Sequence, residues 1–335
     1  MAEQESATVG TTLDNGGGQP YSGWPTPRLT STEADRLAQG EISASRASPR
    51  QHLHIGYRRD EAPAAAWRQV PKGLLNPMPY VELPGIHLWY HDTGGNGTPV
   101  VFMHAASGTA ESWVYQLPAF TAAGYRCITY DRRGWGRSRT DPAGDQPGYV
   151  SDDLDGLAAH LGLERFHVVA TAAGGIGGLD YALAHPERVR SLVVADSIGG
   201  VQDPEYLAVQ HRLRPPEIQA LPVELRELGA GYRGTNPEGT RRWLEIEHGS
   251  RQEGTQGLGQ PPRNPMTLAR LETLQVPVLV LVGEADLLSP PALMRLLAAH
   301  LPHCQFATVP EAGHAAHWEE PVIWNRLVLE FIGQH

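Results

Sequence analysis

Two acidic residues and a histidine near the C-terminus have the spacing of an acid–base pair. Glu284 and Asp286 follow one short apolar segment, and His314 follows the next one. If both segments are parallel strands, these residues lie at carboxyl ends of strands, where open α/β sheets form their ligand crevice. A carboxylate that accepts a hydrogen bond from the Nδ1–H of a histidine fixes its tautomer and stabilises the imidazolium. We therefore predict that Asp286 orients His314 as a base, in preference to Glu284 or to Asp196, which follows an earlier apolar segment.

An alanine occupies the position where the surrounding sequence predicts a nucleophile. The apolar run Phe166–Thr171 leads into Ala172, Ala173 and Gly174, and helical spacing follows. A strand that turns sharply into a helix through small residues is the setting of a nucleophile elbow, which raises one side chain above the sheet. The methyl group of Ala172 cannot attack a substrate. The alanine is either native or a replacement for a serine, and the unusual neighbours Thr171 and Ala173 favour a native residue.

Alternating strands and helices are predicted from Pro79 onward, and these elements must position the residues above. Continuously apolar segments such as 99–104 are typical of strands buried on both faces. The alternation predicts an α/β fold with a doubly wound, mostly parallel sheet and right-handed crossovers. The predicted strands are 80–84, 86–91, 99–104, 126–130, 166–171, 191–195, 276–283 and 305–309. The predicted helices are 150–161, 175–184, 291–301 and 318–332.

The alternation is interrupted once, and a polar region precedes it. Residues 198–265 are polar, rich in proline and glycine and helical in spacing. We therefore predict a small helical cap inserted into a core formed by residues 79–197 and 266–335. Residues 1–78 are predicted to be a tail and linker, partly disordered, because they lack sustained periodicity. Within them, Ser31–Leu37 has the pattern of one short capped helix.

Four motifs together resemble the α/β-hydrolase family over residues 79–335. They occur in the family's order along the chain: His104–Gly108, Tyr130–Ser138, the turn at Ala172, and the acid and histidine described above. The resemblance implies an oxyanion hole formed by the backbone N–H groups of Ala106 and Ala173, the second at a helix N-terminus whose dipole favours negative charge. In the second motif, we expect Asp131 and Arg133 to pair and brace the loop.

The resemblance implies an enzyme that acts on a small carbonyl-containing substrate, by hydrolysis of an ester, a lactone or a C–C bond. With a serine at position 172, the mechanism would be acyl transfer. With alanine, His314 could activate water, or could deprotonate the substrate in a lyase or isomerase reaction. A third alternative is a non-catalytic small-molecule receptor, but a pure binding protein has no need of an Asp286–His314 pair.

Several residues are candidate substrate contacts. Ser107 and Thr171 carry hydroxyl groups near the expected oxyanion hole, although neither lies at the apex where a substitute nucleophile would be expected. In the predicted cap, Trp243 and a set of leucines favour a partly hydrophobic substrate. Arginines in the cap could meet an anionic group, although arginines on surface helices are usually solvated. The leucines are Leu207, Leu213, Leu221, Leu225 and Leu228, and the arginines are Arg212, Arg214, Arg241 and Arg242.

Composition argues against several other classes of protein. The formal net charge is -10 and no basic stripe is present, which argues against a nucleic-acid partner. No apolar run reaches the roughly 18 residues that span a membrane. His317 follows His314 without a cluster of metal ligands, and the glycines after Ala172 lack dinucleotide-binding spacing. We therefore expect a small-molecule substrate, no metal and no cofactor.

The two cysteines, Cys127 and Cys304, both fall in strand-like segments. We interpret them as small buried residues in a reducing compartment rather than as a disulfide. The N-terminus has neither the basic nor the apolar region of a secretory signal. These features predict a cytoplasmic location. A homo-oligomer remains an open alternative, since the long tail could reach a neighbouring subunit.

Overall fold

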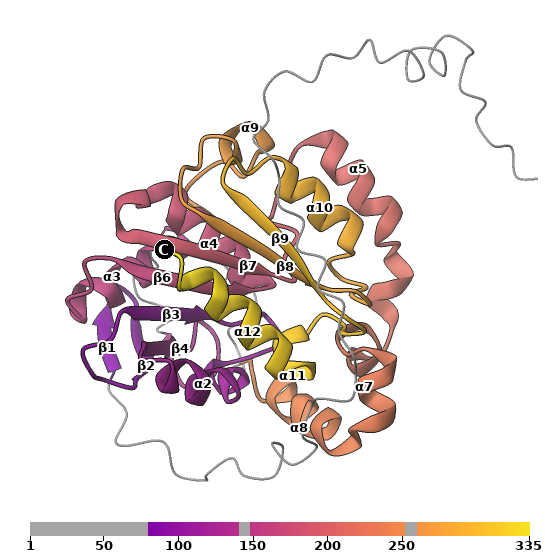
Figure 1. Cartoon of the computed structure of the whole chain (residues 1–335), viewed down its shortest axis with the longest axis horizontal. Helices are drawn as coiled ribbons and strands as arrows, with labels where there is room; N and C mark the ends of the chain where they lie inside the picture. The colour runs from indigo at the N-terminus through magenta and orange to yellow at the C-terminus, as the bar shows by residue number, and fades with distance from the viewer. Residues whose placement is uncertain (1–79, 141–147, 252–259) are drawn as a thin grey trace, which may run out of the picture. The chain divides into compact units, whose positions relative to one another are not determined.

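The computed structural model describes residues 80–140, 148–251 and 260–335, and Figure 1 shows the chain. The predicted tail and linker, including the short helix at Ser31–Leu37, lie outside the described residues.

A mostly parallel sheet runs through the described part of the chain. Its strand order is β1-β2-β4-β3-β6-β7-β8-β9, and β5 pairs with β2. The β1–β2, β2–β4 and β2–β5 pairs are antiparallel, whereas every pair from β4 to β9 is parallel. The α/β fold with a mostly parallel sheet is therefore confirmed. The strands are β1 (Tyr80–Leu83), β2 (Ile86–Asp92), β3 (Pro99–Met103), β4 (Arg126–Tyr130), β5 (Arg139–Thr140), β6 (Phe166–Thr171), β7 (Val189–Ala195), β8 (Val278–Gly283) and β9 (Cys304–Val309).

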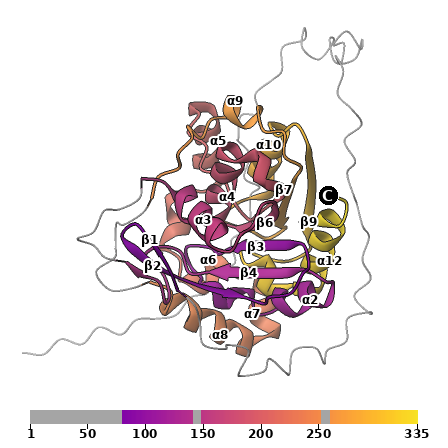
Figure 2. The same cartoon turned by 90° about the vertical axis from the view of Figure 1, so that its left-hand side faces the viewer.

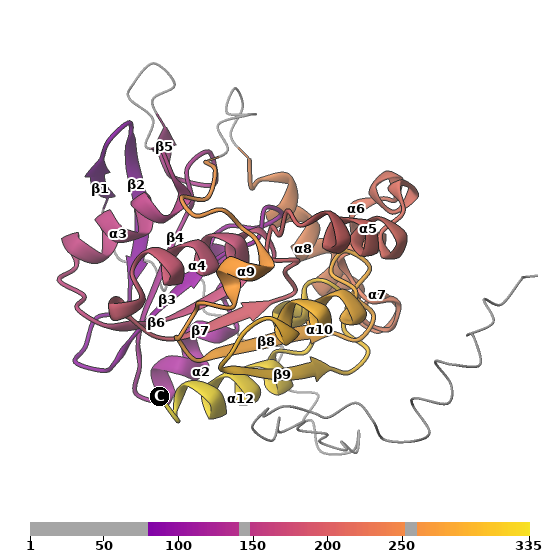
Figure 3. The same cartoon turned by 90° about the horizontal axis from the view of Figure 1, so that it is seen from above.

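Helices cover both faces of this sheet. Figure 3 shows α3 and α4 on one side of the strands and α2 and α12 on the other. Doubly wound sheets have this arrangement because right-handed crossovers on either side of the first strand place helices on opposite faces. The helices are α2 (Gln116–Ala122), α3 (Val150–His160), α4 (Ala173–Ala184), α10 (Pro291–Ala299) and α12 (Pro321–Ile332).

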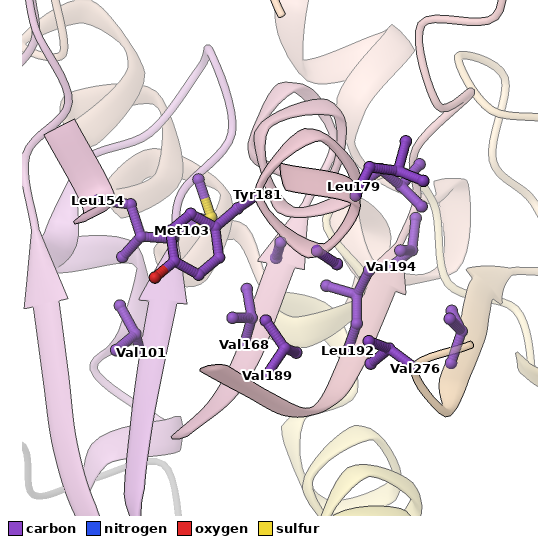
Figure 4. Packing of buried hydrophobic residues seen from close by; sticks show 14 of the residues in the cluster. Val101, Met103, Leu154, Val168, Leu179, Tyr181, Val189, Leu192, Val194 and Val276 are labelled. Atoms are coloured by element: carbon purple, nitrogen blue, oxygen red, sulfur yellow. The ribbon is translucent and has the colours of Figure 1, made fainter. Parts of the chain in front are cut away.

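Alternate residues of the central strands fill two apolar cores. Val168 of β6 belongs to the core under α3, α4 and α10, while its neighbour Val169 belongs to the core under α2 and α12. Figure 4 shows the first core, with Leu179 near Val194 and Tyr181 beside Met103 and Leu154. Burying each such side chain contributes about 1.5–3 kcal/mol. This two-sided packing holds the carboxyl ends of the strands in place.

Short helices interrupt the alternation between β7 and β8. Figures 1 and 2 show α7 and α8 in orange, with α8 at the lower edge of both views. Pro204 and Pro237 open two of these helices, where the missing N–H of proline costs nothing. We call residues 198–265 the insertion. Its helices are α5 (Pro204–Leu213), α6 (Val223–Glu227), α7 (Ala230–Thr235) and α8 (Pro237–His248), and α9 (Leu268–Leu271) follows before β8.

Two local expectations were wrong. The last helix, predicted over 318–332, is split into α11 (Ala316–Glu319) and α12. The break occurs because Pro321 has no backbone N–H to donate to the preceding turn. Asp131 does not pair with Arg133. Asp131 accepts hydrogen bonds from Arg137, whereas Arg133 pairs with Asp153 of α3. Both side chains still stabilise the loop. Arg133 does so through Asp153, which lies 20 residues further along the chain, and Asp131 does so through Arg137, on the other side of the turn.

Candidate active site

His314 and Asp286 are hydrogen-bonded to each other in the loops that follow β9 and β8. The Nδ1 atom of His314 lies 3.0 and 2.9 Å from the two carboxylate oxygens of Asp286. Oδ1 of Asp286 also accepts hydrogen bonds from the backbone N–H groups of Leu288 at 2.7 Å and Ser289 at 2.8 Å. Because the carboxylate can only accept, His314 donates from Nδ1 and keeps Nε2 for other contacts.

The charges around His314 favour its protonated form. Burial disfavours the imidazolium, but the Asp286 carboxylate outweighs this effect and, with Glu227 and Asp196, raises the pKa of His314 to about 9. Burial and repulsion from Asp286 raise the pKa of Asp196 well above its usual range. Burial also raises the pKa of Glu227. The cluster therefore places two carboxyl groups with raised pKa values beside the Asp286–His314 pair.

Ala172 forms a strained turn between β6 and α4. Its φ is 50° and its ψ is -118°, a conformation that L residues rarely adopt and that costs about 1–3 kcal/mol. The N–H of Ala172 donates to the carbonyl of Ala195 at 2.9 Å, which ties the turn to β7. A Cβ atom at Gly174 would overlap the backbone carbonyl of Met103. The small residues are thus needed because α4 and β3 approach closely.

A second turn, after β3, carries Ala106. The buried His104 donates from Nδ1 to the carbonyl of Ala105 at 2.7 Å, and its Nε2 accepts the backbone N–H of Arg132 at 2.9 Å. These partners select the neutral tautomer, and burial lowers the pKa of His104 well below its usual value. Trp135 donates from Nε1 to the carbonyl of Ala106 at 2.8 Å. The peptide of Ala106 is therefore held between two turns.

A cavity of about 270 Å³ brings most of the predicted site residues together. Its wall contains Ala106, Ser107, Ala172, Ala173 and His314. As the first residue of α4, Ala173 has an N–H without an intrahelical acceptor. A base, a strained turn and a helix N-terminus therefore share one small space, which is the arrangement needed for attack on a carbonyl group.

Comparison with known proteins assigns the chain to a family. The model of the alpha/beta hydrolase family matches residues 100–326. The chain belongs to the alpha/beta hydrolase family. The matched range includes both turns and the Asp286–His314 pair.

Hydrolases of small molecules are found among the relatives of this alpha/beta hydrolase. A 2-hydroxy-6-oxononadienedioate/2-hydroxy-6-oxononatrienedioate hydrolase of Paraburkholderia phymatum is 28% identical over 278 residues, covering 74% of this chain and 92% of the relative. The enzyme of the same name numbered 2 from Pseudomonas putida is 30% identical over 293 residues, covering 82% and 98%. The solved structure of a malate-bound thermophilic esterase from Thermogutta terrifontis has a TM-score of 0.63 at 26% identity, covering 77% and 97%.

Some predicted contacts lie away from the cavity. Thr171 is fully buried at the end of β6 and is not part of the cavity wall. Trp243 packs against Trp318 and His317 in an aromatic cluster. The leucines expected to line the site are also elsewhere: four of them, Leu207, Leu213, Leu221 and Leu225, are exposed. Helical spacing identified an apolar face of each short helix but could not show what that face meets.

Two acidic residues of the cavity wall differ in what the sequence indicated: Asp196 was weighed only as a rival partner for His314, and Glu227 was missed. Asp196 lines the cavity, is fully buried and has a positive φ of 48°. Its Oδ1 accepts the N–H of Gly283 at 2.9 Å. Glu227, at the end of α6, accepts the hydroxyl hydrogen of Ser107 at 2.8 Å. Asp196 had been considered as a rival partner for His314, but nothing in the local pattern of Glu227 distinguishes it from a surface residue.

One buried carboxyl group joins the insertion to the loop of His314. Glu319 of α11 accepts the N–H of Gly229 at 2.8 Å and the N–H of Gly313 at 3.0 Å. Burial raises the pKa of Glu319 to about 7 despite these bonds. The backbone N–H of Ala315 also donates to the carbonyl of Glu227 at 3.1 Å. These bonds therefore tie the insertion directly to the loop that carries His314.

Residues 80–140, 148–251 and 260–335 contain no group of three or more His, Cys, Asp or Glu side chains that could hold a metal ion. Within the same ranges, every helix is too short or too polar to cross a membrane. His317 lies between aromatic rings, with Trp113 at a centroid distance of 4.8 Å, and burial lowers its pKa to about 3. Cys127 is buried in β4 and Cys304 is half-buried; both are free thiols.

Proposed function

We propose that this chain is an enzyme that hydrolyses a small carbonyl-containing substrate, an ester, a lactone or a C–C bond next to a carbonyl, with His314 as the general base. The observation that carries the proposal is the 2.9 Å contact between His314 Nδ1 and Asp286 beside a cavity that also contains Ala172. The names of the curated relatives, which are hydrolases of oxo-dicarboxylates, support a substrate with a carbonyl group.

Water takes the place of a side-chain nucleophile in this proposal. Neutral His314 accepts a proton from water at Nε2 while the water oxygen bonds to the carbonyl carbon. The N–H groups of Ala106 and Ala173 hold the resulting oxyanion. When the intermediate collapses, the leaving group takes the proton from the imidazolium. One water is consumed and no acyl-enzyme forms, because Ala172 offers no atom that could carry the acyl group.

The insertion serves as the cap in this proposal, over a core made of residues 79–197 and 266–335. The contacts of Glu319 with Gly229 and Gly313 support this role, since they couple residues 198–265 to the histidine loop. A cap that excludes bulk water strengthens the electrostatic contacts inside the cavity.

Asp196 favours a second candidate function, a lyase or isomerase. A carboxyl group with a raised pKa and a histidine base near one cavity form an acid–base pair that could move a proton between two substrate atoms without adding water. Burial and the neighbouring Asp286 both raise the pKa of Asp196 well above its usual range.

The test compares three forms of the protein on a panel of 4-nitrophenyl esters and lactones: the chain as it stands, His314→Gln and Ala172→Ser. We expect turnover without an acyl adduct in the first, loss of turnover in the second, and an acyl adduct visible by mass spectrometry in the third. Turnover that survives His314→Gln would contradict the proposal. Deuterium exchange into a ketone substrate without hydrolysis would favour the lyase or isomerase, and binding without turnover in all three forms would favour a receptor.

A further inference from the structure

Three arginines in the cavity wall form no ion pair within the described part of the chain. Arg214, Arg226 and Arg251 all line the cavity that contains His314 and Ala172. Two half-buried arginines elsewhere do form ion pairs, Arg126 with Asp92 and Arg188 with Asp155. Arg190 and Arg233 are half-buried and form none among the described residues, but neither of them lines the cavity. The chain has more acidic than basic residues, 37 against 27, so a shortage of carboxylates does not explain the difference.

Parts of two of these guanidinium groups are out of reach of water and lack a hydrogen-bond acceptor among the described residues. The Nε atoms of both Arg214 and Arg226 are buried without a partner. Arg226 donates from Nη1 to the backbone carbonyl of Gln219 at 3.1 Å, which holds the side chain but does not neutralise it. Burial lowers the pKa of Arg214. A desolvated cation with an unused donor is costly unless a ligand supplies the acceptor.

The acidic residues of the cavity form no ion pair with these arginines in the described part of the chain. Burial raises the pKa of both Asp196 and Glu227, and Glu227 accepts the hydroxyl hydrogen of Ser107. Glu247 is the third acidic residue of the cavity wall. Its carboxylate Oε2 lies 3.8 Å from Nε2 of His248. Among the described residues, the three arginines of the cavity wall therefore have no carboxylate at ion-pair distance.

We propose that Arg214 and Arg226 form a subsite for a carboxylate group of the substrate, with Arg251 on the same cavity wall. This inference rests on the proposed function and deepens it, because it makes the substrate a small molecule that carries both a reacting carbonyl and a separate carboxylate. A planar carboxylate can accept two parallel N–H bonds from a guanidinium. A cavity of about 270 Å³ admits only a small molecule.

The test uses two substrates that differ only in charge: 4-nitrophenyl hemisuccinate and its methyl ester. We expect a higher kcat/KM for the free carboxylate. Arg214→Gln and Arg226→Gln should each reduce kcat/KM for that substrate about 10–100-fold, mainly through KM, while changing the methyl ester less than about threefold. Arg212→Gln is the matched control. Arg212 is exposed in the last turn of α5, the helix that Arg214 caps, and it does not line the cavity.

A binding measurement separates this inference from the proposed function. Calorimetric titration of His314→Gln with glutarate should detect binding that is lost when Arg214→Gln or Arg226→Gln is added, and inorganic phosphate should bind more weakly than glutarate. If glutarate binds through these arginines but no ester is hydrolysed, the subsite stands and the proposed hydrolysis fails. Equal kcat/KM for both substrates, glutarate binding unaffected by both arginine variants, or stronger binding of phosphate would overturn the carboxylate subsite.

Discussion

The two sides of the cavity differ in the side chains that each one presents. On the β8–β9 side, His314 and Asp286 are joined to each other, and Asp286 is further held by two backbone N–H groups. On the β6–α4 side, Ala172 has a strained backbone with φ 50° but only a methyl group. The shape of that turn is set by its bond to Ala195 and by close packing beside Gly174, not by the side chain at its apex.

This difference shows that a backbone arrangement and the side chain it presents are independent properties. The strain at Ala172 costs about 1–3 kcal/mol whether or not a nucleophile is present. The Asp286–His314 pair, in contrast, exists only because both side chains are present. Substitutions of Ala172 should therefore add activity or relieve backbone strain, whereas substitutions of Asp286 or His314 should remove activity.

The largest effect is expected for Asp286→Asn. Asparagine cannot stabilise the imidazolium and does not select the Nδ1–H tautomer, so hydrolysis should fall about 10³-fold or more. Glu284→Gln is the matched control, because Glu284 lies two residues away and bonds to Thr308 at 3.0 Å instead of His314. Steady-state rates on an activated ester measure both. Equal losses in the two variants would show that Asp286 has no special role.

A faster hydrolysis of activated esters is expected from a change at Ala172, on the other side of the cavity. Ala172→Ser should raise the rate with an activated ester about 10²-fold, because a serine at the strained turn would complete the set of nucleophile, base and oxyanion donors. A burst of product before steady state is the measurement. The double variant Ala172→Ser with His314→Gln should lose this gain; a gain that persists there would mean that the serine does not depend on the histidine.

The pH dependence should reflect the carboxylates around His314. Since Asp286 raises the pKa of His314 to about 9, the neutral base is scarce at pH 7, and kcat/KM should rise about tenfold per pH unit up to that pKa. In Asp286→Asn, burial without the carboxylate should move the rising limb below the ordinary histidine pKa. A profile that is flat between pH 6 and 9 in the unaltered chain would contradict His314 as the base.

The same raised pKa affects stability in a defined direction. A proton bound more tightly in the folded state stabilises it fully below the unfolded pKa of roughly 6.5, and this contribution disappears as the pH rises through about 9. The free energy of unfolding in urea should therefore decrease between pH 6 and 10 by more in the unaltered chain than in His314→Gln. Identical decreases in the two proteins would contradict this linkage.

The smallest effect is expected for Ala172→Gly. Glycine adopts positive φ without strain, so the free energy of unfolding should rise by about 1 kcal/mol and activity should change little. Ala173→Gly is the matched control, because this neighbour is already helical and should lose stability instead. Thermal unfolding measures both variants. A loss of stability in Ala172→Gly would show that the turn carries no strain.

The sequence alone was sufficient to predict the order of strands and helices and the pairing of Asp286 with His314. Both depend on local patterns: apolar runs buried on two faces, and polar residues directly after parallel strands. Only the tertiary structure showed that Glu227, Arg214, Arg226 and Arg251 line the same cavity and that Thr171 and Trp243 do not. The physical reason is that short insertion helices joined by prolines have no fixed direction until they pack, so sequence spacing cannot state which side chains they bring to the site.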